Sequence, residues 1–330
     1  MMEKLLQVNE LETQFTKDKE KLKILRGVNF HINKGEVLGL VGESGCGKSL
    51  TSLSIMKLFK GTSGEISGGS ISFKGEDLTH KSEREMRKIR GKLMAMIFQE
   101  PMTSLNPVMK IGEQLLEPIR LHLDLNEKQA KEHVIFILKK VGIPRAEEIV
   151  YEFPHQLSGG MRQRIMIAMA MSCNPQLLIA DEPTTALDVT IQAQILELMK
   201  QLQREEGMSV LLITHDLGVV AEMCDRVAVM YAGRVVEEAN VFDLFETPQH
   251  PYTKGLIGSV PKIGQRKDKL TSIKGNVPDP SNMPKGCKFA PRCNEAMAIC
   301  LEEEPSATDL GDGRKCSCWM IEEGRKNVYA

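Results

Sequence analysis

The chain has no long hydrophobic run, no surplus of either charge and no internal repeat. Apolar runs such as residues 37–41 and 210–213 fall far short of the roughly 18 residues that a membrane-spanning helix needs. The first 15 residues mix charged with apolar side chains and offer no small-residue cleavage site, so no secretory signal is predicted. Lys and Arg number 43 against 44 for Asp and Glu, a net charge of -1 that gives no support to nucleic-acid binding. We therefore expect a protein on the cytoplasmic side that does not bind nucleic acid.

A length of 330 residues allows about two domains. Short β-branched runs alternate with amphipathic stretches up to about residue 239, the pattern of an α/β core whose expected strands are 28–32, 36–41, 177–180 and 210–214. Between about 107 and 154 the strand signals give way to helical spacing, which predicts an inserted helical subdomain at about 103–175. Frequent prolines then indicate turns and short helices. We expect a first domain at 1–260 and a C-terminal extension at 261–330.

The eight residues that directly follow the second expected strand fit the pattern G-x-x-x-x-G-K-S/T: Gly42, Glu43, Ser44, Gly45, Cys46, Gly47, Lys48 and Ser49. A strand before this loop and an amphipathic helix behind it meet the structural context that the pattern requires. The glycines let successive N–H groups turn inward around a phosphate, Lys48 adds a mobile positive charge, and Ser49 offers a hydroxyl ligand for Mg²⁺. By itself the pattern could also be a glycine-rich turn.

Two further segments point to phosphate chemistry. The apolar run 177–180 ends in Asp181 and Glu182, which suits one carboxylate that orients Mg²⁺ and a neighbour that activates water. Residues 157–163 place Ser158 and two glycines at a helix N-terminus, a second anion site. His215 directly follows the strand 210–214, at the edge where ligands of parallel sheets bind. A lone acidic strand end would be structural as often as functional, and a lone histidine would more often be structural.

Taken in chain order, the loop, Gln99, residues 157–163, 178–182 and 185–188, and His215 resemble the nucleotide-binding subunit of ABC transporters. The resemblance covers roughly residues 5–260 and implies a P-loop NTPase fold of the ABC type, with ATP and Mg²⁺ as its ligands. It further implies a head-to-tail dimer, in which ATP held by one cassette meets the signature segment of a second.

The same resemblance assigns roles to individual residues. The ATP-binding set comprises Gly42, Glu43, Ser44, Gly45, Cys46, Gly47, Lys48, Ser49, Leu50 and, for adenine stacking, Phe15. Mg²⁺ would be held by Ser49, Gln99 and Asp181. The catalytic set is Glu182 as general base, with Gln99 and His215 near the γ-phosphate. Contacts to the ATP of the second cassette would come from Ser158, Gly159, Gly160 and Gln163, with Asp188 at the dimer seam.

Residues 98–107 look like the extended glutamine loop of oligopeptide and dipeptide importers, and the His-Pro-Tyr-Thr run 250–253 looks like their C-terminal extension, although each could be a plain connector. Five of the eight cysteines lie in the final 44 residues, a grouping that in a reducing compartment favours a metal over disulfides. This tail resembles that of the same importers, some of which hold a 4Fe–4S cluster. The resemblance selects Cys287, Cys293, Cys300 and Cys318 and leaves Cys316 as the spare. Zinc or no metal are the alternatives, although the cysteine spacing does not match structural zinc sites.

The expected function is ATP hydrolysis that energises the import of di- and oligopeptides, by a peripheral subunit at the cytoplasmic face of the cell membrane. The resemblance implies two membrane permease subunits, a second ABC ATPase that is a paralogue, and indirectly an extracytoplasmic peptide-binding protein. Similar ATPases serve nickel and certain sugars, so the solute stays open. A soluble cassette ATPase acting on nucleic acid is the rival, disfavoured by the single phosphate loop and the net charge of -1. A non-catalytic cassette is disfavoured because Lys48, Asp181, Glu182 and His215 are all present.

Overall fold

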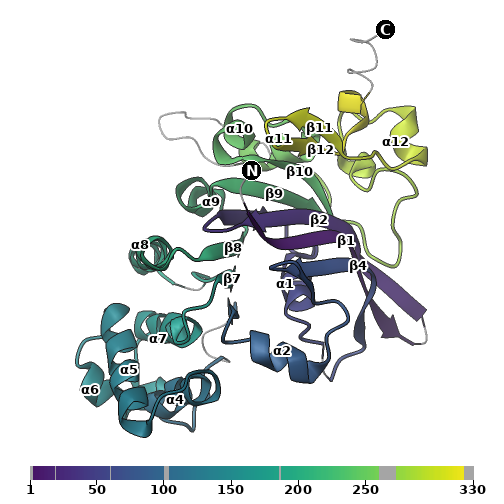
Figure 1. Ribbon diagram of the computed structural model, residues 1–330. Helices are drawn as coiled ribbons and strands as arrows, with labels where there is room; N and C mark the ends of the chain where they lie inside the picture. The colour runs from purple at the N-terminus through teal and green to yellow at the C-terminus, as the bar shows by residue number, and fades with distance from the viewer. Residues whose placement is uncertain are drawn as a thin grey trace. The chain divides into compact units, whose positions relative to one another are not determined.

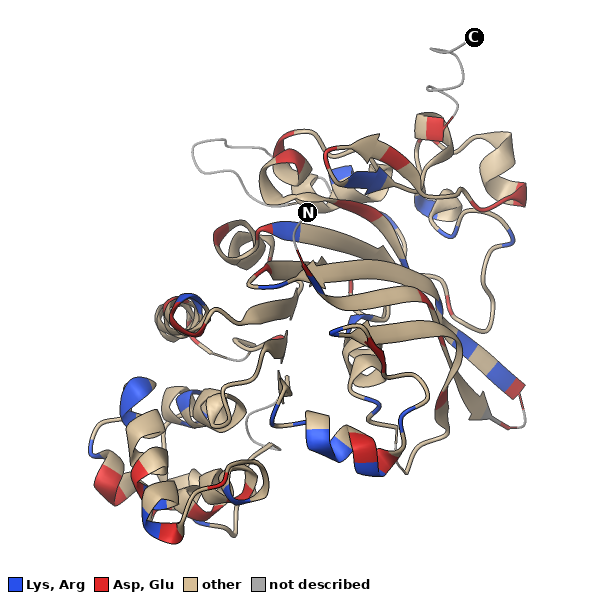
Figure 2. Ribbon diagram, viewed as in Figure 1, with Lys and Arg blue, Asp and Glu red and all other residues tan. Residues whose placement is uncertain are grey.

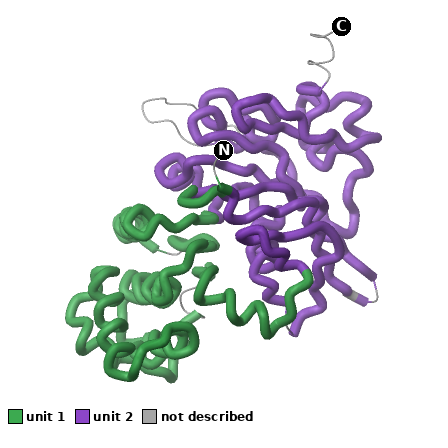
Figure 3. Tube along the Cα trace, viewed as in Figure 1, with its two compact units in different colours: residues 1–3, 33–36, 80–212 green, residues 4–32, 37–79, 213–330 purple. Residues whose placement is uncertain are grey.

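The computed structural model describes residues 3–18, 20–59, 61–99, 104–185, 187–259 and 273–322. Two compact units divide the chain (Figure 3): unit 1 comprises residues 1–3, 33–36 and 80–212, and unit 2 comprises 4–32, 37–79 and 213–330. The chain passes between the units several times, so neither unit is one continuous segment. The expected division at residue 260 falls in 260–272, outside the described residues, and stays a prediction.

Unit 2 carries strands of two sheets. A four-stranded antiparallel sheet has the order β2-β1-β4-β5, formed by β1 (Lys4–Lys17), β2 (Glu20–Asn33), β4 (Gly64–Phe73) and β5 (Glu76–Asp77). In the second sheet β3 (Val37–Val41) pairs in parallel with β9 (Arg226–Tyr231). Antiparallel pairing then adds β10 (Arg234–Asn240), β12 (Arg314–Cys316) and β11 (Thr308–Gly311) in that order. All five residues of β3 are buried, as its continuous apolar run predicts.

The helices of unit 2 are short, and three of them begin at a capping side chain. They are α1 (Lys48–Ile55), α9 (Leu217–Met223), α10 (Val241–Glu246), α11 (Pro251–Gly258), the 3₁₀ turn η2 (Ala290–Arg292) and α12 (Ala298–Glu302). Asp216, Asn240 and His250 each cap a helix by accepting a backbone N–H bond. Helix α1 has no side-chain cap, and its N-cap Gly47 has a φ of 107°. The N-terminus of α1 is therefore not covered by a capping side chain.

Unit 1 is mainly helical (Figure 1). Its helices are α2 (Glu83–Ile89), α4 (Ile111–His122), α5 (Glu127–Lys140), α6 (Ala146–Ile149), η1 (Pro154–Gln156), α7 (Gly159–Met171) and α8 (Val189–Glu206). Strand β6 (Met94–Ile97) pairs in parallel with β7 (Leu177–Asp181), and β8 (Ser209–Thr214) starts in this unit and ends in unit 2. The apolar faces of α4, α5 and α7 pack against one another, with Leu115 and Leu138 fully buried.

The structure confirms the α/β fold with an inserted helical segment and corrects several details. The expected strand 28–32 is the end of the much longer β2. The extension was expected to hold turns and short helices, yet it also contributes the β11–β12 hairpin. This hairpin is too short and too polar to show an alternating pattern in the sequence.

None of the helices in the described part of the chain is both long and apolar enough to span a membrane. Charges of both signs intersperse on the helices of unit 1 (Figure 2).

Candidate functional site

The phosphate loop lies between β3 and α1 in unit 2. Three glycines there have positive φ angles, 153° at Gly42, 80° at Gly45 and 107° at Gly47. At Gly42 a Cβ atom would also overlap the carbonyl oxygen of Met230, so the turn requires glycine at this position. Lys48 is 6% exposed, and its Nζ donates to the carbonyl oxygens of Gly42 at 2.7 Å and Glu43 at 3.0 Å. The loop therefore holds its lysine folded against its own backbone.

The remaining loop residues divide between surface and core. Ser44 and Gly45 are exposed, and a Cβ on Gly45 would meet open space. Cys46 is fully buried, and burial raises the pKa of its thiol, so the residue contributes to packing while its backbone belongs to the loop. Ser49 and Leu50 are half-buried in the first turn of α1.

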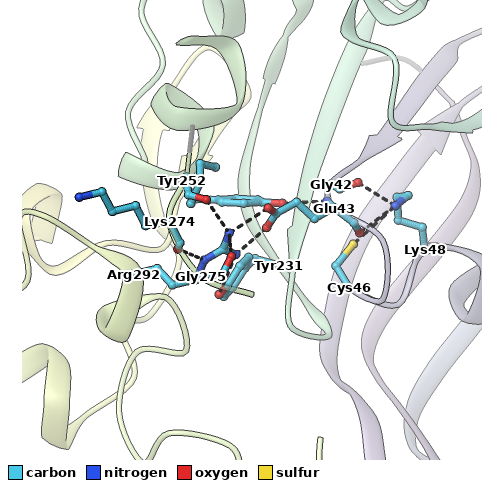
Figure 4. A network of polar contacts seen from close by, with 10 residues as sticks. Gly42, Glu43, Cys46, Lys48, Tyr231, Tyr252, Lys274, Gly275 and Arg292 are labelled. Atoms are coloured by element: carbon cyan, nitrogen blue, oxygen red, sulfur yellow. Dashed lines mark hydrogen bonds and ion pairs between the residues drawn. The ribbon is translucent and has the colours of Figure 1, made fainter. Parts of the chain in front are cut away.

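Glu43 turns its side chain away from Lys48 toward the C-terminal extension (Figure 4). Arg292 donates to both carboxylate oxygens of Glu43, at 2.6 and 2.9 Å. The hydroxyl of Tyr252 accepts the backbone N–H of Glu43 at 2.8 Å. Sequence reasoning did not include Arg292 or Tyr252 in the site. The available signal was the His-Pro-Tyr-Thr run, which supplies Tyr252.

The two carboxylates follow β7 in unit 1. Asp181 ends the strand and is 4% exposed. Glu182 has a φ of 48°, a left-handed conformation that costs a non-glycine residue about 1 kcal/mol and is typical of functional sites. Its Oε2 accepts hydrogen bonds from Gln99 Nε2 at 3.0 Å and from Thr185 Oγ1 at 2.9 Å. The structure thus brings together the expected base and the expected γ-phosphate sensor, and it adds a contact from Thr185, to which the sequence analysis gave a place in the motif 185–188 but no role.

The signature segment of unit 1 begins α7 as expected. Ser158 is the N-cap and accepts the backbone N–H of Met161 at 3.3 Å. Gly159 and Gly160 follow it, half-buried, in the first turn. Gln163 is 1% exposed and its amide donates to the carbonyl oxygen of Pro183, next to Glu182. Gln163 therefore ties this helix to the carboxylate turn, and its expected contact with a second cassette stays a prediction.

Three other expected site residues have clear places. Asp188 caps α8 by accepting the backbone N–H of Ile191 at 2.9 Å. His215 is exposed directly after β8, in unit 2. Phe15 is half-buried near the end of β1, with its ring edge-to-face against Phe59 at 6.4 Å. Residues 100–103 of the glutamine loop and Ala186 lie outside the described residues.

The four selected cysteines of the extension line one pocket, namely Cys287, Cys293, Cys300 and Cys318. The backbone N–H of Cys287 donates to the carbonyl oxygen of Cys300 at 2.8 Å. Burial raises the pKa of the Cys287 thiol, and the nearby Cys300 and Cys318 thiols raise it further. Cys316 lies in β12 instead and is not among the pocket-lining residues. In the described part of the chain no three His, Cys, Asp or Glu side chains form a group that could hold a metal ion as they stand.

Comparisons with known proteins agree with this geometry. The sequence profile of the family described as ABC transporter matches residues 25–185, and the profile described as oligopeptide/dipeptide transporter, C-terminal region, matches residues 236–300. A solved ATP-binding cassette, MJ0796, in a dimeric post-hydrolysis state with ADP and Pi, is 26% identical with a TM-score of 0.64, covering 72% of this chain and 99% of that one. Another, cbiO1 from Clostridium perfringens, is 28% identical with a TM-score of 0.63, covering 74% and 92%. Fold and site define an ATP-hydrolysing cassette of the ABC type.

Two relatives from Bacillus subtilis (strain 168) narrow the class further. The oligopeptide transport ATP-binding protein AppD is 57% identical over 98% of both chains. The dipeptide transport ATP-binding protein DppD is 52% identical over 98% of this chain and 96% of its own. The chain therefore belongs to the family of oligopeptide and dipeptide transport ATP-binding proteins.

Proposed function

We propose that this chain hydrolyses ATP to drive the import of di- and oligopeptides through a membrane transporter. The identity of 57% to AppD over 98% of both chains carries the proposal, because it includes the cassette and the C-terminal extension together. AppD, DppD and OppD are named for oligopeptide or dipeptide transport. Nickel or another solute is the alternative, since the permease and the solute receptor select what is carried.

Hydrolysis requires groups that hold the phosphates and a carboxylate that activates water. The loop N–H groups and Lys48 would hold the phosphates, after the ammonium group leaves the two carbonyl oxygens that it contacts here. Glu182 would accept a proton from the attacking water, oriented by the hydrogen bonds from Gln99 and Thr185. Ser49, Asp181 and Gln99 would hold Mg²⁺, which offsets the charge of the phosphates. Phe15 would stack on the adenine, and His215 would contact the γ-phosphate.

The active unit is proposed to be a head-to-tail pair of cassettes. Ser158, Gly159 and Gly160 present a capped helix N-terminus, which suits the phosphates of a nucleotide held by a second chain. Asp188 would lie at the seam of that pair. The MJ0796 cassette has been solved as a dimer. Two permease subunits, a paralogous second ATPase and an extracytoplasmic peptide-binding protein would complete the transporter, with this chain at the cytoplasmic face of the membrane.

Glu182→Gln tests the catalytic assignment. The amide keeps the size of the side chain but cannot take a proton, so we expect ATP binding to persist and turnover to fall at least about a hundredfold. The variant should also accumulate as an ATP-bound dimer, measurable by size-exclusion chromatography with light scattering. Hydrolysis at the parental rate would show that Glu182 is not the base.

Transport itself is tested in proteoliposomes that contain this chain with two permease subunits and a second ATPase of a peptide transporter. We expect ATP-dependent uptake of labelled di- and oligopeptides, abolished by Glu182→Gln in this chain. Uptake of nickel without uptake of peptides would refute peptide import and support the alternative.

We also propose that Cys287, Cys293, Cys300 and Cys318 hold a 4Fe–4S cluster, with zinc as the alternative. The support is the pocket that the four residues share and the small core around it, in which Ala290, Cys300 and Trp319 are the buried members. Four thiolates suit such a cluster, and a segment with so small a core would gain folding free energy from it.

Anaerobic purification followed by iron, sulfide and zinc quantification tests the cluster, with Cys293→Ser as the variant and Cys316→Ser as the matched control. About four irons and four sulfides per chain are expected in the parent and the control, with loss in the variant. Zinc, or no metal, would refute the cluster and leave the ATPase assignment intact.

A further inference from the structure

Arg292 is a residue of the C-terminal extension that reaches the phosphate loop (Figure 4). Its side chain is 4% exposed, and it holds Glu43 through two parallel N–H bonds at 2.6 and 2.9 Å. The guanidinium also donates to the carbonyl oxygens of Lys274 at 2.9 Å and Gly275 at 3.1 Å. It lies 5.7 Å from the ring centre of Tyr231. Such a buried, two-pronged arrangement fixes both partners far more firmly than a surface ion pair does.

Glu43 places a negative charge in a loop that is expected to bind a polyanion. Its backbone carbonyl oxygen accepts a hydrogen bond from the Lys48 ammonium group, and its side chain is a carboxylate. An unpaired carboxylate there would repel the phosphates and would compete with them for Lys48. The positive charge of Arg292 neutralises this carboxylate, and the two hydrogen bonds hold the Glu43 side chain away from Lys48.

We propose that Arg292 is a positioning residue for ATP binding, which neutralises Glu43 and so lets the C-terminal extension set the affinity of the phosphate loop for nucleotides. The proposal rests on ATP binding at this loop and goes beyond it, because it gives the extension a direct part in that binding. Arg292 itself contacts Glu43 and the extension, and it acts on the nucleotide only through Glu43.

A merely structural role for Arg292 would have a different signature. If the residue only anchored the extension, its loss would weaken the chain regardless of what stands at position 43. If it acts by cancelling a charge, removal of that charge must compensate for the loss of Arg292. The double-mutant comparison of Arg292→Met with Glu43→Gln therefore separates the two roles.

The experiment measures equilibrium binding of ATP and ADP to the full chain by displacement of a fluorescent nucleotide. We expect Arg292→Met to weaken ATP binding about tenfold, which corresponds to about 1.4 kcal/mol, and to weaken ADP binding less because ADP carries less charge. Addition of Glu43→Gln should return the ATP affinity to within about threefold of the parent. The deficit of Arg292→Met should also shrink as salt is raised.

Arg234→Met is the matched control, since Arg234 pairs with Glu304 of the extension at 3.0 Å and does not belong to the loop network. It should leave ATP affinity unchanged. Arg292→Lys, which keeps the charge but loses the two-pronged geometry, covers the case in which Arg292→Met does not fold, and a loss of about threefold is expected. An unchanged ATP affinity in the Arg292 variants, or a double variant as weak as Arg292→Met, would overturn the proposal. Failure of the parent to bind ATP would instead refute the proposed function.

Discussion

Replacement of Tyr252 by phenylalanine removes a single hydroxyl group and keeps a ring that is fully buried. That hydroxyl accepts the backbone N–H of Glu43 at 2.8 Å, and burial raises the pKa of the phenol, so the group stays neutral. The ring would keep its contacts, with centroids 4.6 Å from Tyr231 and 5.4 Å from Phe289. The variant therefore isolates one hydrogen bond between helix α11 and the phosphate loop.

A buried N–H group that loses its acceptor costs about 1–3 kcal/mol. Glu43 is half-buried, so water can replace part of the bond, and we expect Tyr252→Phe to lower the free energy of unfolding by about 1–2 kcal/mol. Tyr252→Ala would lose the ring as well and cost about 3–5 kcal/mol.

Urea unfolding followed by tryptophan fluorescence measures this cost. The chain has one tryptophan, Trp319, which is 9% exposed and lies in the same unit as Tyr252, so its emission reports on the relevant part of the molecule. Tyr151→Phe serves as the control and is followed by circular dichroism because Tyr151 lies in unit 1; Tyr151 is 68% exposed, and loss of its hydroxyl should change stability by less than about 0.5 kcal/mol. Equal unfolding free energies for the two variants would refute the argument that Tyr252 supports the loop.

Three further predictions follow from local geometry. Gly233 has a φ of 83°, and a Cβ there would overlap a main-chain carbonyl oxygen, so Gly233→Ala should lower the free energy of unfolding in urea by about 3 kcal/mol or more. Gly311→Ala is the control and should cost about 1 kcal/mol, because Gly311 has a similar φ but a Cβ there would meet open space. Burial lowers the pKa of His250 from 6.5 to about 3. As the pH falls below 6.5, this histidine binds a proton in the unfolded chain but not in the folded chain, so stability present above pH 6.5 is lost as the pH falls toward 3. His250→Asn, which keeps a helix cap, should weaken the pH dependence of the urea unfolding midpoint between pH 6.5 and about 4. A pH dependence equal to that of the parent would contradict this. Thr185→Val removes one donor to Glu182 and should lower kcat about tenfold with little change in KM for ATP, whereas a rise in KM alone would point to a binding role.

Much of the site could be predicted because its signals are local. The glycines of the phosphate loop, the strand before it and the helix behind it lie within about twenty residues, and backbone sterics alone demand glycine at Gly42. The Ser158 cap and the acidic end of β7 are likewise properties of a few adjacent residues. The cysteine set was chosen by resemblance, and the structure places its four members around one pocket.

The sequence by itself determined the class of the protein, through motifs in which neighbouring residues carry both the local structure and the chemistry. Only the tertiary structure decided what holds those motifs in place. Arg292 lies 249 positions from Glu43 and Tyr252 lies 209 positions from it, so no periodicity or short motif could join them. The burial of Gln163 against the carbonyl oxygen of Pro183 likewise joins residues twenty positions apart. Side chains far apart in the sequence meet only when strands and helices pack, and the energetic value of a charge such as that of Glu43 depends on the partner that packing supplies.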